Sequence, residues 1–118
     1  MRSYLLAVGM LAMSQVALAA GAFEGDWSGT IRGGKFPSGR NCGSEDMKFT
    51  VAGMHLDGKD IYTGGFVAFS ADIAPDGTIK GATQYGRPVL GKFSGDTASG
   101  TIEGVTCGVQ TFEVKKAH

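Results

Sequence analysis

The stretch FEGDWSGTIR, residues 23–32, has apolar residues or glycine at the odd positions and polar residues at the even positions. A period of two puts successive side chains on opposite faces, so this stretch predicts a β-strand with one buried face. The stretch MKFTV, residues 47–51, repeats the pattern. No segment from residue 20 onward shows the 3.6-residue period of an amphipathic helix. The sequence therefore predicts an all-β fold.

Further short strands follow at roughly ten-residue spacing, separated by turn signals. The stretch APDG, residues 74–77, predicts a tight turn, and Asp57-Gly58 predicts a hairpin. A change of parity at Gly53 indicates a bulge. We therefore expect seven or eight strands in a small antiparallel meander barrel or, alternatively, a sandwich. No linker divides residues 20–118, so we expect one β-barrel-like domain there.

We expect the interior of so small a barrel to be filled with side chains. Three glycines have the parity of the apolar face: Gly29, Gly81 and Gly91. The sequence leaves open whether these glycines provide space inside the barrel or only permit tight curvature of its strands.

Residues 1–19 have the three parts of a secretory signal peptide. Arg2 is basic, Leu5–Leu18 is an almost uncharged apolar run, and Ala17-Leu18-Ala19 is a small-x-small cleavage pattern. The run is short for a membrane span, which needs about 20 apolar residues. We therefore predict export to the periplasm or secretion, and no membrane insertion of the mature chain. A retained anchor helix is the alternative.

Charge argues against nucleic acid as a partner. The segment 20–118 holds ten of the eleven basic residues, because Arg2 precedes it, and all eleven acidic residues. Its net charge is therefore near −1. Without a basic excess, the domain lacks the means to neutralise phosphates. We expect any macromolecular partner to be another exported protein, and the sequence leaves the oligomeric state open.

The two cysteines, Cys42 and Cys107, both follow the expected cleavage site. In an oxidising compartment such a pair predicts a disulfide. The two cysteines are 65 positions apart, and a disulfide across such a loop stabilises the folded protein by roughly 4 kcal/mol, because it restricts the unfolded chain. Free thiols or a metal pair are the alternative, but neither cysteine has another cysteine or a histidine at ligand spacing.

The sequence contains no catalytic constellation, and we predict that the protein is not an enzyme. His55 shares a strand face with Asp57, but a lone histidine beside a turn is usually only exposed. A metal site formed by His55, Asp57 and Asp60 is conceivable, although this set is loose and close to ordinary turn chemistry. We expect no metal and no cofactor.

The longest irregular stretch is GGKFPSGRNCGS, residues 33–44. Long loops on rigid β scaffolds often hold function. This loop combines an aromatic anchor with basic and amide side chains, and aromatic residues with arginine are common in interface hot spots. The candidate binding residues are Lys35, Phe36, Arg40 and Asn41.

Gly25-Asp26-Trp27 resembles the Gly-x-Trp motif that opens the first strand of the calycin barrels, which include lipocalins, avidins and small periplasmic protease inhibitors. The resemblance implies that Trp27 closes one end of the barrel and that a basic side chain, Lys115 or Lys116, covers it. The inhibitors act through their N-terminal segment, here Ala20–Glu24. They close their disulfide early in the chain, whereas Cys107 is late. The chain also resembles small, exported, glycine-rich bacterial β proteins of unassigned role.

Three functions are consistent with these observations. The first is a non-catalytic exported binding module that uses the loop 33–44. The second is an inhibitor of a protease or a cell-wall hydrolase. The third is a carrier for a small apolar ligand, which predicts a cavity lined by four side chains: Val67, Phe69, Phe93 and Phe112.

Overall fold

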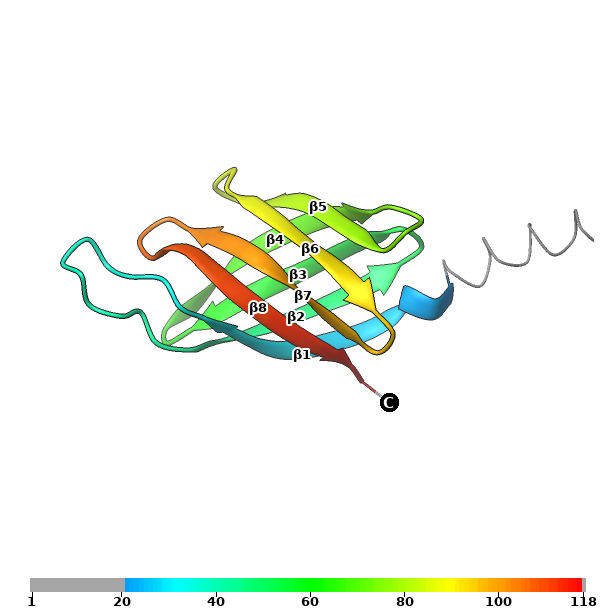
Figure 1. Cartoon of the computed structure of the whole chain (residues 1–118), viewed down its shortest axis with the longest axis horizontal. Helices are drawn as coiled ribbons and strands as arrows, with labels where there is room; N and C mark the ends of the chain where they lie inside the picture. The colour runs from blue at the N-terminus through cyan, green and yellow to red at the C-terminus, as the bar shows by residue number, and fades with distance from the viewer. Residues whose placement is uncertain (1–20, 118) are drawn as a thin grey trace, which may run out of the picture.

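Eight antiparallel strands close into one barrel in the computed structural model, which describes residues 21–117 (Figure 1). The predicted signal peptide, residues 1–19, lies outside the described residues. The all-β barrel with one disulfide is confirmed, and the sandwich alternative is not what forms. The strands are β1 (Gly25–Arg32), β2 (Glu45–Ala52), β3 (His55–Tyr62), β4 (Gly65–Ile73), β5 (Thr78–Thr83), β6 (Pro88–Ser94), β7 (Thr97–Gly104) and β8 (Gly108–Lys116).

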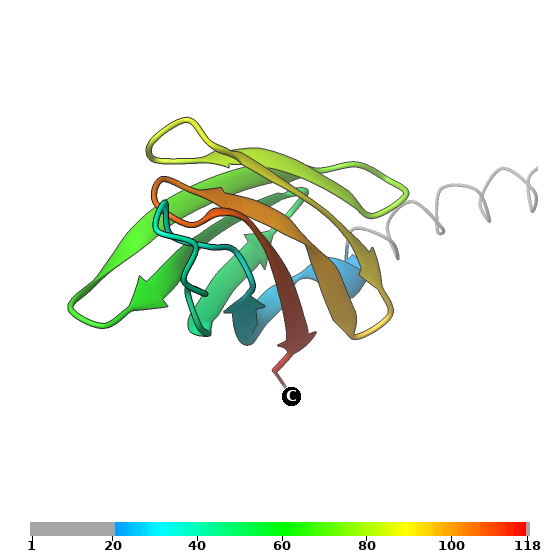
Figure 2. The same ribbon diagram turned by 60° about the vertical axis from the view of Figure 1, so that its left-hand side comes forward.

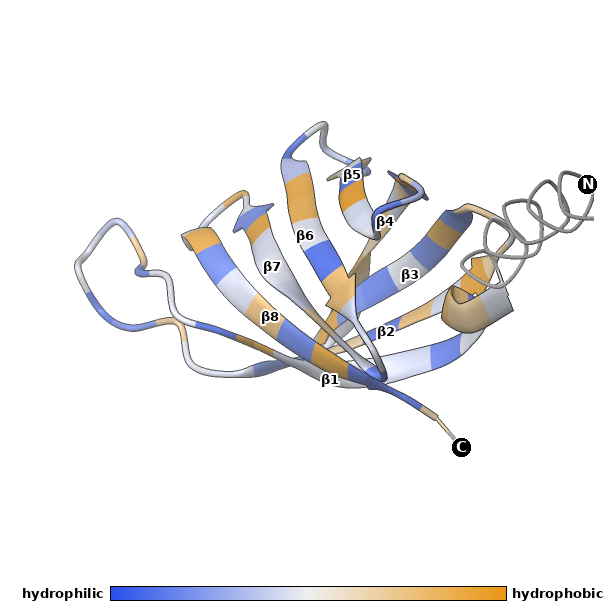
Figure 3. Ribbon diagram, turned by 45° about the vertical axis from the view of Figure 1, so that its right-hand side comes forward, coloured by the Kyte–Doolittle hydropathy of each residue, from blue (hydrophilic) through white to orange (hydrophobic). Residues whose placement is uncertain are grey.

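Each strand pairs with its neighbour in sequence, and β8 closes the barrel by pairing with β1. Closure removes the open edges that would otherwise expose backbone hydrogen-bonding groups. Along β1, Trp27 and Ile31 are buried while Asp26 and Ser28 are exposed, as the alternation predicts. Figure 3 shows the same alternation of hydropathy along the ribbon of several strands.

The prediction for the first hairpin is wrong. Its turn lies at Gly53-Met54, where Gly53 has a φ of 66°, and Ala52 pairs with His55 across it. Asp57-Gly58, predicted as the turn, lies in the middle of β3. A Cβ on Gly58 would collide with the Lys48 carbonyl and the Phe49 side chain. This glycine therefore permits close packing between strands, so the Asp-Gly pair does not mark a turn here.

The glycines on the inner face do not create space. A Cβ on Gly29, Gly81 or Gly91 would collide with backbone atoms of a neighbouring strand. They are therefore sites of close approach in a tightly curved barrel. The turn predicted at residues 74–77 is present, since the Gly77 N–H donates to the Ala74 carbonyl over 2.8 Å.

The barrel has two different ends, named here by their contents. The closed end contains Trp27, the last residues of β2, β4, β6 and β8, and the helical residues 21–23. The open end contains the loop 33–44 and the turns β3–β4, β5–β6 and β7–β8, and it is on the left in Figure 1. Between residues 21 and 117, no helix has the length and apolar character needed to cross a membrane.

Candidate functional site

The closed end is packed with aromatic rings. The Phe23 ring stacks on Phe93 at 4.6 Å between centroids, and Trp27 meets Phe93 edge to face at 4.8 Å. The Trp27 indole N–H donates to the Phe23 carbonyl over 2.9 Å. The segment before β1 therefore covers this end. Of the segment that an inhibitor would use, Ala20–Glu24, Phe23 is engaged with the barrel, and Ala20 lies outside the described residues.

A lysine from the last strand lies beside Trp27. Lys116 is the cross-strand neighbour of Trp27, and its ammonium donates to the Ala22 carbonyl over 3.2 Å. Lys115, the other candidate, is exposed and pairs with Ser28. Lys116 thus tethers the segment that covers the closed end.

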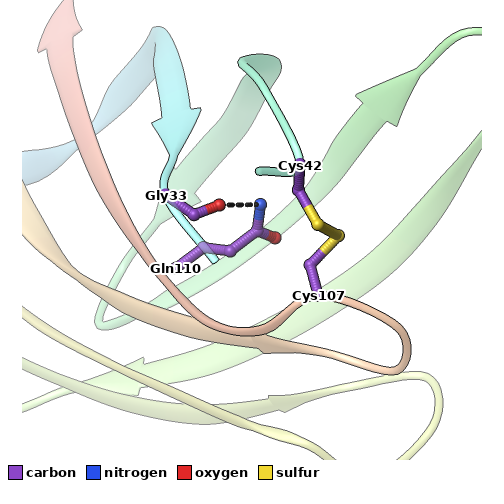
Figure 4. The surroundings of a disulfide bond; sticks show 4 residues. All are labelled: Gly33, Cys42, Cys107 and Gln110. Carbon is purple, nitrogen blue, oxygen red and sulfur yellow. Dashed lines mark hydrogen bonds between the residues drawn. A yellow bond between two sulfur atoms is a disulfide. The ribbon is translucent and has the colours of Figure 1, made fainter. Parts of the chain in front are cut away.

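A disulfide joins the open-end loop to the β7–β8 turn. Cys42 and Cys107 are bonded, with their Cα atoms 6.1 Å apart, which confirms the predicted pairing. Figure 4 shows the bridge beside Gly33 and Gln110, whose side-chain amide donates to the Gly33 carbonyl over 3.1 Å. The Lys35 N–H also donates to the Cys107 carbonyl over 3.0 Å. The loop is therefore held against the barrel at both of its flanks.

The four predicted binding residues lie together at the tip of this loop. Lys35 and Asn41 form an isolated β-bridge, and the Phe36 N–H donates to the Arg40 carbonyl over 2.8 Å. The tip is thus a small hairpin presented on a fixed base. In Figure 2, in which the open end comes forward, the loop lies beside the β7–β8 turn. Phe36 is 39% exposed and also lines a pocket at the open end.

The open end contains a solvent-open pocket of about 970 Å³. Its wall includes the loop residue Phe36, the disulfide, Val67 from β4 and Ile102 from β7. Volumes of this order are typical of small-molecule sites. The interior is therefore filled towards the closed end but hollow at the other. Of the cavity residues predicted for an apolar ligand, only Val67 lines this pocket, whereas three belong to the packed core: Phe69, Phe93 and Phe112.

All three buried polar residues among positions 21–117 line this pocket: Asp60, Thr83 and Gln110. Thr83 is used by the fold, since its hydroxyl accepts from the Tyr85 and Arg87 N–H groups. Gln110 is used as well, through its bond to Gly33. Asp60 differs, because it is only 6% exposed and its Oδ1 has no hydrogen-bond partner. A buried acceptor without a partner is costly, so Asp60 is the residue that structure alone does not explain.

The pKa of Asp60 is raised to about 8, mainly by burial and further by hydrogen bonding with, and repulsion from, Glu45. At neutral pH the Asp60 carboxyl group is therefore largely protonated. Sequence analysis missed this pair. The signal was present, because Leu56, Gly58 and Asp60 share one parity, and that parity is the inward one.

The weakly predicted metal set is not assembled. His55 and Asp57 are exposed on the outer face of β3, with Nε2 of His55 3.5 Å from Asp57, whereas Asp60 points into the barrel. His55 Nδ1 lies 3.0 Å from Asp72 on β4. Within the described residues, no group of three or more acidic, histidine or cysteine side chains is placed to hold a metal ion. The geometry of His55 therefore agrees with its interpretation as an ordinary exposed strand histidine.

Comparison with known proteins adds no relative: no protein-family model and no curated protein matches the chain.

Proposed function

We propose that the protein is a non-catalytic, exported binding module, and that its ligand is a small molecule held in the open-end pocket. The observation that supports this most is the Asp60 carboxyl group in the pocket wall, whose buried Oδ1 has no hydrogen-bond partner. A ligand that donates a hydrogen bond to this oxygen would offset the cost of burying it. The disulfide supports an oxidising compartment, as expected of an exported protein.

The distribution of exposed apolar side chains points to the same end. Among the described residues, every large apolar side chain that is exposed belongs to the open half of the barrel: Phe36, Tyr62, Phe66, Tyr85, Leu90, Val105 and Val109. Gathered exposed apolar groups mark binding surfaces, whereas scattered single ones need no explanation. Four of these side chains line the pocket, namely Phe36, Tyr62, Tyr85 and Val105, and such a lining suits a ligand that has an apolar part.

The test is native mass spectrometry of the protein taken from its own compartment. We expect a non-covalent adduct on the wild type, together with loss of two hydrogens to the disulfide. The variant Val67→Trp fills the pocket and should remove the adduct. Ala52→Trp adds the same ring to an exposed residue at the closed end, where β2 finishes, and should keep the adduct. An adduct that survives in both variants would exclude the pocket as its site.

Protein docking through the loop tip is the second candidate, and it includes inhibition of a protease or a cell-wall hydrolase. It is favoured by the fixed hairpin that presents Lys35, Phe36 and Arg40. A preorganised loop loses little entropy on binding. A copurifying protein that is lost on Arg40→Ala but retained on Val67→Trp would support this candidate over the small-molecule site.

A further inference from the structure

The pocket wall has charges of one sign only. It includes four acidic side chains and no lysine, arginine or histidine. One of the four, Glu103, already faces Arg87, with 3.7 Å between the carboxylate oxygen and the guanidinium nitrogen. The remaining three are Glu45, Asp46 and Asp60. An anionic ligand would therefore meet uncompensated repulsion, whereas a cation would meet complementary charge.

Asp60 is the part of this wall that points to a missing ligand. It is more than nine-tenths buried, it lines the pocket, and its Oδ1 has no partner in the fold. Glu45 from β2 is the charged group that acts on it, whereas the β4 residue directly opposite is the apolar Val67. A ligand ammonium could donate to both carboxyl groups, and charge-assisted bonds of this kind are among the strongest.

The rim supplies the second element of amine recognition. Phe36, Tyr62 and Tyr85 line the pocket and are all partly exposed. Aromatic rings attract organic cations through their negative faces, and also cover the attached hydrocarbon. A ring at this end already interacts in this way, since the Lys59 ammonium lies 4.3 Å from the centre of Phe66.

We propose that the open-end pocket binds a small organic ammonium ion, with Asp60 and Glu45 accepting its N–H groups and the rim rings packing on its apolar part. This inference rests on the proposed function, and it names the ligand class. A free divalent cation fits less well, because the described residues include no cluster with metal-ligand geometry. It also leaves the apolar rim without a role.

The experiment compares three probes of almost equal shape: 2-phenylethylamine, 2-phenylethanol and 3-phenylpropanoate. Each is titrated into the ¹⁵N-labelled, disulfide-bonded protein near pH 8.5, where Asp60 is largely ionised and the amine is still protonated. We expect the amine to shift the backbone amides of Asp60 and Val67. The alcohol should bind at least about tenfold more weakly, and the carboxylate should not bind.

Two matched variants test the role of Asp60. Asp60→Asn should weaken amine binding about tenfold and leave binding of the alcohol unchanged. Asp57→Asn alters a carboxylate three residues away on the outer face of the same strand and should change neither. The amide spectrum of each variant reports whether it is folded. Amine binding to the wild type should also release protons near neutral pH, because the ammonium favours ionised Asp60.

Three results would overturn the inference. One is equal binding of the alcohol or the carboxylate at the same amides, which would leave a small-molecule site of another class. Another is Ca²⁺ shifting those amides and displacing the amine. The third is the absence of any shift with the amine at millimolar concentration. In each case the native-mass adduct, and its response to Val67→Trp, separately decides whether the proposed function stands.

Discussion

The closed and open ends of this barrel are built from the same eight strands, yet their interiors differ in kind. At the closed end, Phe23, Trp27 and Phe93 fill the space, and the one indole N–H is satisfied by a backbone carbonyl. At the open end, the inward positions include Asp60 and Gln110, and a pocket remains. The difference indicates that one end stabilises the fold and the other is available for binding.

The two ends are also held together differently. The closed end relies on ring packing and on Lys116, whose ammonium bonds to Ala22. The open end relies on a covalent link between Cys42 and Cys107. A covalent link suits an end with a cavity, because it needs no buried apolar area to hold the loop in place. Four experiments test this difference between the two ends.

The largest effect is expected at the closed end. Trp27→Ala removes a side chain that is 1% exposed and leaves a cavity among aromatic rings, so it should lower the free energy of unfolding by about 5 kcal/mol. Denaturant unfolding monitored by circular dichroism measures this loss. Tyr85→Ala removes an exposed ring from the open rim and should cost no more than about 0.5 kcal/mol. Equal losses would refute the division of roles.

The second effect concerns the covalent link. Replacing both cysteines, Cys42→Ser with Cys107→Ser, releases the constraint on a separation of 65 residues and should lower stability by about 4 kcal/mol. Hydrogen exchange should show the extra opening at residues 33–44 before the closed end is affected. If exchange at Trp27 accelerates as much as exchange at Phe36, the two ends do not behave independently.

The third change, Asp60→Asn, should raise the free energy of unfolding rather than lower it. Between about pH 4 and pH 8 the folded protein binds more protons at Asp60 than the unfolded chain does, because the folded pKa is raised to about 8. Stability therefore falls as pH rises through this window. Asp60→Asn should remove this dependence and raise the free energy of unfolding at pH 8. Thermal unfolding from pH 4 to 9 tests this, with Asp57→Asn as the control. A parallel pH profile for wild type and Asp60→Asn would contradict it.

The smallest effect on stability is expected from the pairing of His55 with Asp72 on the outer surface of the closed end. The pKa of His55 is raised, first by its hydrogen bond to Asp72 and further by Asp57. The folded state therefore favours the protonated imidazole, and this contribution is present below about pH 6.5 and lost as pH rises through the raised pKa. Both side chains are largely exposed, so Asp72→Asn should cost less than about 0.5 kcal/mol at pH 5. An NMR titration of His55 should show its pKa falling in the variant, and an unchanged pKa would be inconsistent with this pairing.

Much of the barrel follows from local patterns. The alternation in residues 23–32 and 47–51 correctly identifies the buried faces around Trp27, Phe49 and Val51. The first hairpin is misplaced, because glycine serves two purposes that sequence does not separate: a left-handed turn at Gly53 and close strand packing at Gly58. Phe23 belongs to the helical residues 21–23 rather than to the strand, and its ring stacks on Phe93.

The loop 33–44 could be predicted as a binding site from the sequence, whereas the carboxyl pair could not. The composition of the loop is enough to identify Lys35, Phe36 and Arg40 as binding candidates, because charge and aromatic character are properties of single residues. Asp60 and Glu45 are 15 positions apart in the chain and unremarkable there. Only the pairing of β2 with β3 and the closure of the barrel bring the two carboxyl groups to one pocket and remove water from Asp60.

The class of fold and the disulfide could be predicted from the sequence alone. Side-chain alternation and turn residues act over short distances, and two cysteines leave a single possible pairing, so these features can be recognised in the amino-acid sequence. Tertiary structure alone decided which end of the barrel is filled and which is hollow. It also buried Asp60 beside Glu45 and left the Asp60 Oδ1 without a hydrogen-bond partner, because desolvation and the proximity of another charge depend on every strand that surrounds a group.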